Sequence, residues 1–469
     1  MIPSLGEVHH VLEKQLDEGA TFASIRCKSV LRERSLKWTD DKVHLNDRHH
    51  YDSWLLETLH SGTWSACSFP NFESLVNHQP QSIQMIKESE TIHGYPNHAK
   101  DILHSKAIRQ ITHPEYQGES LPAVEKLMME MRRVSEFFQH PISANYRDRL
   151  IRSQYWDSEH SRGGSEYVNQ DLTIHHCGKM GEDHELQLNN VYSLPLVKDN
   201  LSLQEFFWGK DLKRWAKTLS EESFSGPSPE DFCWIFSNRA FAQLIQGTLG
   251  PTLCLQRPDP FLESMNPASI NETVIASSCL NLASQPSLFC DSIFIDEEGV
   301  PARHMPLVEA GVLKNFVMTR SSAHQLSRNL PVNKEKICAG STRVASFDLQ
   351  FYPDLKHIVV QGGSSLEKDF RLSHLYINDL QVFPLDDIEQ SFLIIAKNVL
   401  VNKFGGQHRR HIGRLRFLVT REMLWSNLLG LGQDAHVVSL PSVNATYEEP
   451  YSLFQVPMAK FRGCPCTWS

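Results

Sequence analysis

Residues Ile295–Phe316 read IDEEGVPARHMPLVEAGVLKNF, and this stretch decides how the second half of the chain is expected to fold. The acidic run Asp296-Glu297-Glu298-Gly299 stands between two apolar stretches, which is typical of a turn between neighbouring strands. The flanking residues Ser292–Ile295 and Met305–Glu309 are therefore predicted strands. The carboxylates of the run could instead bind a metal ion or transfer protons, although the residues by themselves favour the turn.

The same strand pattern continues through the rest of the second half. Apolar runs separated by turn residues predict further strands. They are Phe316–Thr319, His357–Gln361, Leu375–Val382, Phe392–Val401, Arg414–Val419 and Phe454–Phe461. Two helices are also predicted. One covers Glu230–Thr248, with Asp231 near its start and Gly247 and Gly250 at its end. The other covers Arg421–Leu429.

The first half of the chain mixes helices with longer strands. Val8, Val11 and Leu12 fall at helical spacing and predict a helix over Glu7–Gly19. Other predicted elements are the strands Thr21–Arg48, Ser53–Ala66, Asp171–His176 and His184–Ser193 and the helices Asn71–Asn77, Leu121–Phe138 and Leu203–Leu219. Because the chain does not alternate strands and helices as repeated βαβ units do, the predicted fold class is α+β.

Two domains are expected in a chain of 469 residues that carries one clear linker signal. The segment Ser223–Pro229 reads SFSGPSP, a composition typical of a connection between folded units. The predicted domains are an N-terminal α+β domain over residues 1–220 and a strand-rich C-terminal domain over residues 221–469. Residues 78–120 are polar, rich in His and Pro and weakly periodic, which predicts a long irregular insertion in the first domain.

Composition makes nucleic acid and membrane poor first guesses for a partner. The chain has 46 Lys and Arg against 55 Asp and Glu, so its net charge is −9. A protein that follows a phosphate backbone usually has the opposite balance. The N-terminus lacks a basic segment followed by an apolar one, and no apolar run is long enough to span a bilayer. A cytoplasmic protein is therefore expected.

A basic cluster is the main unexplained group of charged residues. His408-Arg409-Arg410-His411 follows two glycines. Its cationic side chains could bind an anion or an acidic peptide. A solvated loop is the simpler interpretation, because the chain is acidic overall and few aromatic residues accompany the cluster. No common zinc, nucleophile or phosphate-loop motif occurs elsewhere.

The ten cysteines are scattered singly, apart from Cys464 and Cys466 on either side of Pro465. Scattered cysteines in a cytoplasmic protein are mostly small buried apolar residues. The Cys464-Pro465-Cys466 pair could instead bind a metal or cycle between redox states. Its position near a chain end favours the structural interpretation.

The stretch Ile295–Phe316 resembles the signature of the TldD/TldE (PmbA) metallopeptidase family. In that family a turn reading Asp-Asp/Glu-Glu-Gly-x-Pro precedes a strand reading roughly Leu-Ile-Glu-x-Gly-Val-Leu-Lys-Gly-Phe. The surrounding elements follow the family's order as well, from Phe22–Ala66 through Ser373–Val382 to Asn427–Gly432. The resemblance covers most of the chain, apart from the insertion at 78–120 and the tail after Arg462.

The family's catalytic members carry a zinc helix reading His-Glu-x-x-x-His, and a later Cys completes their metal site. The matching segment here is Asn238-Arg239-Ala240-Phe241-Ala242-Gln243, followed by Gln246 where the family has Glu. Ala240, Phe241 and Gly247 keep the family's frame, so the resemblance implies that every reactive position has been replaced. Gly432–Ser442, where the third ligand is expected, has no Cys.

These replacements remove the chemistry that a zinc peptidase needs. Zinc prefers imidazole, thiolate or carboxylate ligands over the neutral amides of Asn238 and Gln243. A general base must accept a proton from the metal-bound water, and the guanidinium of Arg239 stays protonated. Without the family resemblance, the same residues are simply the polar outer face of an amphipathic helix. Both interpretations predict no catalysis at this helix.

The resemblance implies a non-catalytic TldE-like subunit that binds no zinc itself and pairs with a zinc-bearing TldD-like subunit. It also implies that the dimer encloses a cleft for an unfolded peptide. Peptide contacts are expected from strand edges in 290–380 by strand addition, from Asp296–Gly299, and from the pair Arg409 and Arg410. Two alternatives stay open: an active hydrolase or peptide-tailoring enzyme with a rebuilt metal site, and a homodimeric peptide-binding protein without a peptidase partner.

Overall fold

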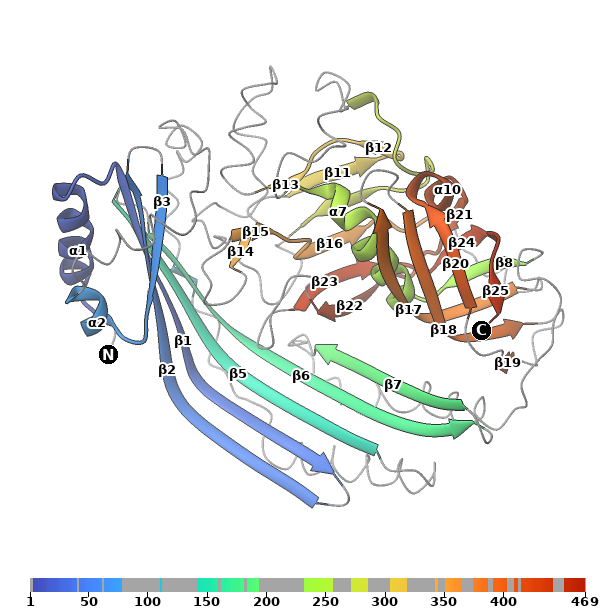
Figure 1. Cartoon of the computed structure of the whole chain (residues 1–469), viewed down its shortest axis with the longest axis horizontal. Helices are drawn as coiled ribbons and strands as arrows, with labels where there is room; N and C mark the ends of the chain where they lie inside the picture. The colour runs from blue at the N-terminus through green and yellow to red at the C-terminus, as the bar shows by residue number, and fades with distance from the viewer. Residues whose placement is uncertain are drawn as a thin grey trace.

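A computed structural model of the chain confirms the α+β fold class, with few helices and many strands in several sheets (Figure 1). The residues that the structure describes are 3–39, 42–60, 63–77, 110–111, 142–158, 162–180, 184–193, 232–255, 271–285, 304–318, 342–344, 351–363, 374–386, 391–402, 409–411, 415–441 and 451–468. The predicted helices Leu121–Phe138 and Leu203–Leu219, the strand Ser292–Ile295 and nearly all of the predicted insertion lie outside them. The boundary near residue 220 also lies outside them and stays a prediction.

Seven of the described strands form one sheet from the first half of the chain. Their order is β3-β2-β1-β5-β6-β4, with β7 also paired to β6. The bounds are β1 Phe22–Thr39, β2 Lys42–His60, β3 Thr63–Phe69, β4 Gln110–Ile111, β5 Ile142–Asp157, β6 Arg162–Met180 and β7 His184–Ser193. The long strands β1, β2, β5 and β6 bend together, so the sheet is strongly curved (Figure 1). This sheet is the most extended part of the molecule.

Two helices cover the end of this sheet where the chain begins. Helix α1 (Leu5–Asp17) starts with a capping box, in which Ser4 and Glu7 satisfy each other's backbone N–H groups. Its apolar face packs on β1 and β2, as the helical spacing predicted. Helix α2 (Phe72–Val76) is capped by Asn71 and lies beside α1 (Figure 1). The buried residues of this cluster are Val8, Val11, Leu12, Ala23, Ile25, Cys27, Trp54, Leu56, Leu75 and Trp156.

The second half of the chain builds an eight-stranded sheet. Its order is β21-β24-β8-β17-β18-β20-β25, with β19 also paired to β18. The bounds are β8 Cys233–Phe236, β17 His374–Asp386, β18 Ser391–Asn402, β19 Arg409–His411, β20 Leu415–Thr420, β21 Leu428–Leu431, β24 Ala459–Arg462 and β25 Thr467–Trp468. Strand β8 lies inside this sheet, between β24 and β17.

A six-stranded sheet packs against the same core. Its order is β12-β11-β10-β16-β23-β22. The bounds are β10 Leu282–Ser284, β11 Met305–Glu309, β12 Val312–Leu313, β16 His357–Val360, β22 His436–Pro441 and β23 Tyr451–Val456. Two small pairs complete the described strands: β9 (Cys254–Leu255) with β13 (Val317–Met318), and β14 (Thr342–Val344) with β15 (Phe351–Pro353).

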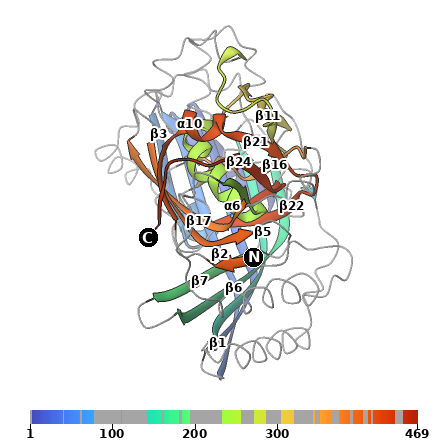
Figure 2. The same ribbon diagram turned by 90° about the vertical axis from the view of Figure 1, so that its right-hand side faces the viewer.

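A single helical segment fills the space between these two sheets (Figure 2). It runs through α6 (Asn238–Leu244), a π-helical turn called η4 (Ile245–Leu249) and α7 (Gly250–Leu253). Around it lies a cluster of aromatic rings contributed by strands and helices that are far apart in sequence. These rings belong to Trp234, Phe236, Phe241, Phe417, Trp425 and Phe461. The helical segment is thus held by the largest core of the described structure.

The two halves of the chain meet at strand edges. Strand β7, paired with β6 in the first sheet, contacts β22, the edge strand of the six-stranded sheet (Figures 1 and 2). Among the described residues, no helix is long and apolar enough to cross a membrane.

The predicted helix over Glu230–Thr248 is wrong at both ends. Residues Cys233–Phe236 form β8, because an apolar run with Trp and Ile can pair with strands on both sides. The helix starts at Asn238 and its cap is Ser237 rather than Asp231. Gly247 does not end the helix, because the π-helical turn carries it on to Leu253.

Two shorter corrections come from the end of the chain. The predicted strand Phe454–Phe461 is two strands, β23 and β24, which belong to different sheets. The predicted helix Arg421–Leu429 is shorter, since α10 covers Arg421–Ser426 and Leu428 begins β21. The predicted strands Met305–Glu309 and His184–Ser193 are confirmed with the same bounds.

The hairpin β11–β12, inside the stretch Ile295–Phe316, is fixed by its turn. Ala310 has φ 46° and Gly311 has φ 76°, the left-handed values of a two-residue hairpin turn. The backbone of Gly311 also docks on the preceding segment, donating to Leu280 O at 3.0 Å and accepting from Ile275 N at 2.9 Å. A Cβ at Gly311 would overlap the carbonyl oxygens of Ala276 and Ser277. This position therefore requires glycine.

We predict that Gly311→Ala lowers the free energy of unfolding by about 2 kcal/mol or more, because it combines left-handed strain with backbone overlap. Urea unfolding followed by circular dichroism measures the change. Gly6→Ala is the matched control: no atom lies within 4 Å of a Cβ there, and Ala in a helix raises stability by up to about 1 kcal/mol. Equal effects of the two changes would contradict the prediction.

Candidate functional site

Helix α6 starts where β8 leaves the sheet. The N–H of Ser237 still donates to Ile377 O of β17 at 2.9 Å, which continues the pairing of the two strands. Its hydroxyl then accepts from Ala240 N at 3.2 Å and caps the helix. The candidate site is therefore placed by a strand that ends beside β17 and turns directly into the helix.

The helix packs closely on the inner side of the eight-stranded sheet. A Cβ at Gly247 would lie 2.6 Å from Cβ of Val382, so only glycine allows this approach. The π-helical turn is held by Thr248, whose hydroxyl donates to Leu244 O at 2.7 Å. That hydroxyl also accepts from Trp425 Nε1 at 2.9 Å. Arg421 of α10 donates to Thr252 in the next turn.

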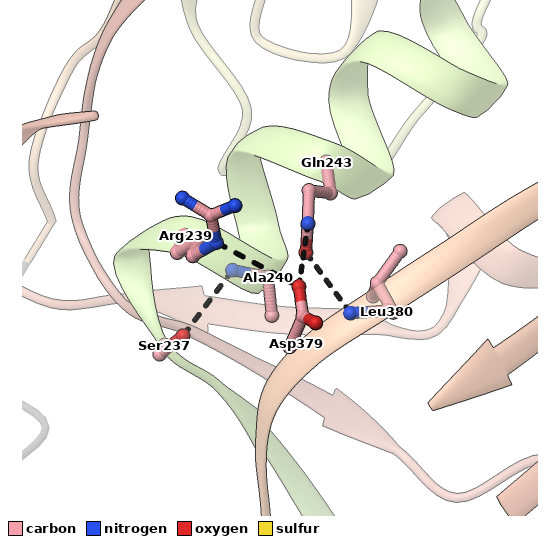
Figure 3. Close-up of polar contacts among 6 residues, drawn as sticks. All are labelled: Ser237, Arg239, Ala240, Gln243, Asp379 and Leu380. Carbon is pink, nitrogen blue, oxygen red and sulfur yellow. Dashed lines mark hydrogen bonds and ion pairs between the residues drawn. The ribbon is translucent and has the colours of Figure 1, made fainter. Parts of the chain in front are cut away.

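Gln243 joins this helix to β17 through both ends of its amide (Figure 3). Its Oε1 accepts from Leu380 N at 2.9 Å, and its Nε2 donates to Asp379 Oδ1 at 2.6 Å. Strand β8 pairs with β17 only as far as Ile377, and none of the described strands continues along this edge. The Gln243 amide takes the place of a strand partner for the next backbone N–H.

Arg239 approaches the same carboxylate from one helical turn earlier (Figure 3). Its Nε lies 3.6 Å from Asp379 Oδ1, and both side chains are about four-fifths buried, at 20% and 19% exposure. Residues four apart share one face of a helix, which explains why Arg239 and Gln243 converge on one aspartate. The result is a neutral Arg–Asp pair with an amide bound to the same oxygen. We call Arg239, Gln243 and Asp379 the helix–strand clamp.

Asn238 points to other partners. Its Nδ2 donates to Val456 O at 2.6 Å and to Asp434 O at 3.3 Å. These carbonyls belong to the end of β23 and to the loop before β22. The structure thus brings Arg239 and Gln243 together but directs Asn238 to backbone groups. Gln246 lies in the π-helical turn and is half-buried.

The residues of this helix do not fit a zinc ion. The amide nitrogens of Asn238 and Gln243 are both occupied as donors, and the Gln243 oxygen accepts a backbone N–H. Arg239 adds a permanent positive charge beside Asp379. Across the described part of the chain, no three His, Cys, Asp or Glu side chains form a group that could hold a metal ion. These side chains hold the helix on the sheet instead.

The sequence did not single out Asp379, yet it is the residue on which the clamp converges. Ile377 and Leu380 of β17 are both buried in the core although they are three residues apart. The alternation of buried and exposed side chains along β17 is therefore interrupted at residues 378–379. The signal was therefore present: a lone aspartate in the middle of an apolar predicted strand. The contact between Asp379 and Gln243 of the helix was not predictable from the sequence, because these two residues are 136 positions apart.

The sequence also predicted two peptide-contact sites away from the zinc-like helix segment. Asp296–Gly299 lie outside the described residues. Arg409 and Arg410 lie on β19, where they pair with Asn402 and Val401 of β18, and only their backbone is described. The basic cluster is therefore partly strand rather than wholly loop.

Cys464 and Cys466 are free thiols in the structure. Cys464 is fully buried, and its sulfur accepts a hydrogen bond from Asn427 Nδ2 at 3.5 Å. Burial raises the pKa of the Cys464 thiol above its ordinary value, so it stays neutral where a metal ligand or redox thiol needs a thiolate. Cys466 packs at the edge of the same core. This environment favours the structural interpretation for the pair.

Comparison with known families gives one match. The model of the PmbA/TldA metallopeptidase C-terminal domain matches residues 230–464, just over half of the chain. That match begins directly before β8 and includes the helix–strand clamp. No curated protein sequence matches the chain.

Three solved structures resemble the whole chain. TldE from Thermococcus kodakarensis has a TM-score of 0.78 at 15% identity, covering 98% of this chain and 99% of that chain. A protein described as a proposed modulator of DNA gyrase from Bacteroides thetaiotaomicron has a TM-score of 0.69 at 14% identity, covering 99% and 98%. A protein of the same description from Thermotoga maritima has a TM-score of 0.66 at 13% identity, covering 98% and 99%. At these identities the likeness concerns the fold.

We predict that Gln243→Ala lowers the free energy of unfolding by about 1–2 kcal/mol, because it leaves the Leu380 N–H and the Asp379 carboxylate with one partner fewer. Thermal and urea unfolding measure the effect. Gln433→Ala is the matched control, since Gln433 is exposed in a loop. If both variants unfold like the unaltered chain, the Gln243 amide does not join helix and strand.

Proposed function

The chain belongs to the PmbA/TldD family of metallopeptidases, and we propose that it is a non-catalytic, TldE-like member that binds unfolded peptides beside a zinc-bearing partner. The partner supplies the metal and the general base. This chain supplies part of the peptide cleft and stabilises the assembly.

One observation carries the proposal. The family's two zinc-binding histidines and its catalytic glutamate are replaced here, and each replacement is engaged in a contact within the fold. Gln243 and Arg239 share Asp379, and Asn238 donates to two backbone carbonyls. Peptide hydrolysis by this helix would require breaking contacts that fix it to the sheet.

Support for peptide binding comes from strand edges in 290–380. An extended peptide gains main-chain hydrogen bonds by joining an edge whose N–H and C=O groups lack a strand partner. The antiparallel pair β14–β15 is a two-stranded sheet among the described strands, so each of its strands has one side without a strand partner there. The proposed charged contacts are Asp296–Gly299, to a peptide amine, and the pair Arg409 and Arg410, to a peptide carboxylate.

Support for a peptidase partner comes from the match to a structure named TldE and from the resemblance to the family's zinc-free branch. A chain without zinc ligands at this helix gains a catalytic role only through a subunit that has them. Co-expression tests this directly. We predict a stable complex with a family member that carries an intact His-Glu-x-x-x-His helix, and zinc-dependent hydrolysis of an unfolded peptide by that complex.

The same experiment includes the chain alone as its control. Purified by itself, the chain should hydrolyse no peptide and hold far less than one zinc per chain by elemental analysis. Stoichiometric zinc together with hydrolysis by the chain alone would sink the proposal and favour a rebuilt metal site. Failure to form any complex with intact family members would favour a peptide-binding protein without a peptidase partner.

The carboxylate contact gives a separate prediction. Arg409→Ser with Arg410→Ser should weaken binding of an unfolded peptide with a free C-terminus by about tenfold, since charge-assisted contacts to carboxylates are the stronger ones. Fluorescence anisotropy measures this. The same peptide with an amidated C-terminus is the control and should bind both forms of the protein equally. Equal weakening for both peptides would exclude a carboxylate contact.

A further inference from the structure

A connector of three residues joins the pair β14–β15 to the six-stranded sheet (Figure 1). Strand β15 ends at Pro353, and β16 begins at His357. Between them lie Asp354, Leu355 and Lys356, whose exposed fractions are 6%, 2% and 5%. Connections between strands normally run over the surface, because the polar groups of a buried loop need partners. This connector is instead buried along its whole length.

Strand β23 holds the two ends of the connector. The hydroxyl of Ser452 donates to Asp354 Oδ2 at 3.2 Å, and Ser452 is fully buried. The next residue, Leu453, donates its N–H to Lys356 O at 2.7 Å. These two bonds come from neighbouring residues of one strand, and one reaches each end of the connector. They therefore fix the direction of the connector relative to the six-stranded sheet.

The middle residue of the connector, Leu355, belongs to the main core. It packs against Gly250 of α7, where an added Cβ would lie 3.5 Å from Leu355 Cδ1. Its backbone also forms a hydrogen bond with the Cys254 thiol of β9. Strand β13, which pairs with β9, contacts β15. Elements from separate parts of the chain thus hold the connector and the strand that precedes it.

The charged residues Asp354 and Lys356 are unusual in a buried connection. Burying ionised groups is unfavourable unless each is paired, and apolar residues of similar size are often as stable in their place. Packing by itself therefore does not explain the charges. A hydrogen bond such as that from Ser452 to Asp354 is directional, whereas apolar contact is not. The polar contact sets an orientation that packing would leave open.

Orientation is important for β14–β15 because the pair is small. It is a two-stranded sheet among the described strands, and a ribbon of two strands is at best marginally stable by itself. A peptide that joins a strand edge must align its N–H and C=O groups with those of the edge. Binding is stronger when the edge is already held in the bound conformation, because less conformational entropy is then lost.

We propose that the connector Asp354–Lys356 anchors the peptide-binding edge, and that Asp354 and Ser452 are positioning residues for peptide binding. This role rests on the proposed peptide-binding function, with β14–β15 as the edge that receives the peptide. The two residues act through the strands, and the peptide contacts the edge itself. A purely structural role would lower stability alone, whereas a positioning role also weakens peptide binding by the folded chain.

Ser452→Ala tests this role against a chemically matched control. It removes a buried hydroxyl from a carboxylate, and Ser24→Ala does the same in the first sheet, where Ser24 donates to Glu57 Oε2 at 3.0 Å. Each variant loses one buried hydrogen bond, so both should lose similar stability. Fluorescence anisotropy with a short labelled peptide of Thr, Val and Lys measures binding. Ser452→Ala should raise the dissociation constant about fivefold or more, and Ser24→Ala less than about twofold.

Hydrogen exchange followed by mass spectrometry gives a second readout that does not need the peptide. Ser452→Ala should speed amide exchange in β14 and β15, and Ser24→Ala should leave exchange there unchanged. Cys254→Ala removes another contact of the connector and should act in the same direction as Ser452→Ala. Because the two contacts come from different strands, the test stands if one variant fails to fold.

The outcomes that would overturn the anchor are distinct. Equal weakening of peptide binding by Ser452→Ala and Ser24→Ala would indicate general destabilisation. Faster exchange in β14 and β15 with unchanged binding would show that this pair does not receive the peptide. Unchanged exchange in both Ser452→Ala and Cys254→Ala would show that the connector does not hold the pair. An unaltered chain that binds no peptide would contradict the proposed function and this role with it, and the exchange data separate that failure from the others.

Discussion

The double hydrogen bond of the Gln243 amide to β17 is the contact on which the second half of the molecule depends. Strand β8 stops beside Ile377, and the helix that follows must cover the β17 edge that β8 leaves unpaired. The Gln243 amide lies one helical turn after Arg239. Its nitrogen donates to Asp379 and its oxygen accepts from Leu380 N, and these two bonds hold the helix between the two sheets. Burying the helix there without the Gln243 amide would leave the Leu380 N–H and the Asp379 carboxylate each with one partner fewer, which is costly in a core.

This constraint gives a structural role to the residues that the family resemblance aligns with the zinc helix. A helix that binds zinc turns its histidines toward a metal, which then becomes a cross-link of its own. In the present helix, Asn238, Arg239 and Gln243 instead contact strands. The clamp at Asp379 fixes the side toward β17, and Asn238 fixes the side toward β23. The two sides together anchor the helix to both sheets.

The two surfaces of the eight-stranded sheet follow from the same arrangement. Its inner face is filled by the helix and by aromatic rings from distant segments. On its outer face, the apolar side chains of Phe383 and Leu418 are exposed. The two faces of this sheet therefore differ, because only the inner one is filled by the core. The first sheet is strongly curved, and its strand β7 contacts β22 of the second half of the chain.

Local patterns in the sequence determined the class of the fold, the helix at Glu7–Gly19, most strands and the family, because periodicity and turn chemistry act over a few residues. They also indicated a helix in the segment that includes α6. They placed its start eight residues too early, at Glu230 instead of Asn238, because the apolar run Cys233–Phe236 suits a helix or a central strand equally until its neighbours are known. Only the tertiary structure decided the partners of Asn238, Arg239 and Gln243, since Asp379 and Val456 reach them across long stretches of chain. Pairing between distant strands places those residues, and no short-range pattern encodes it.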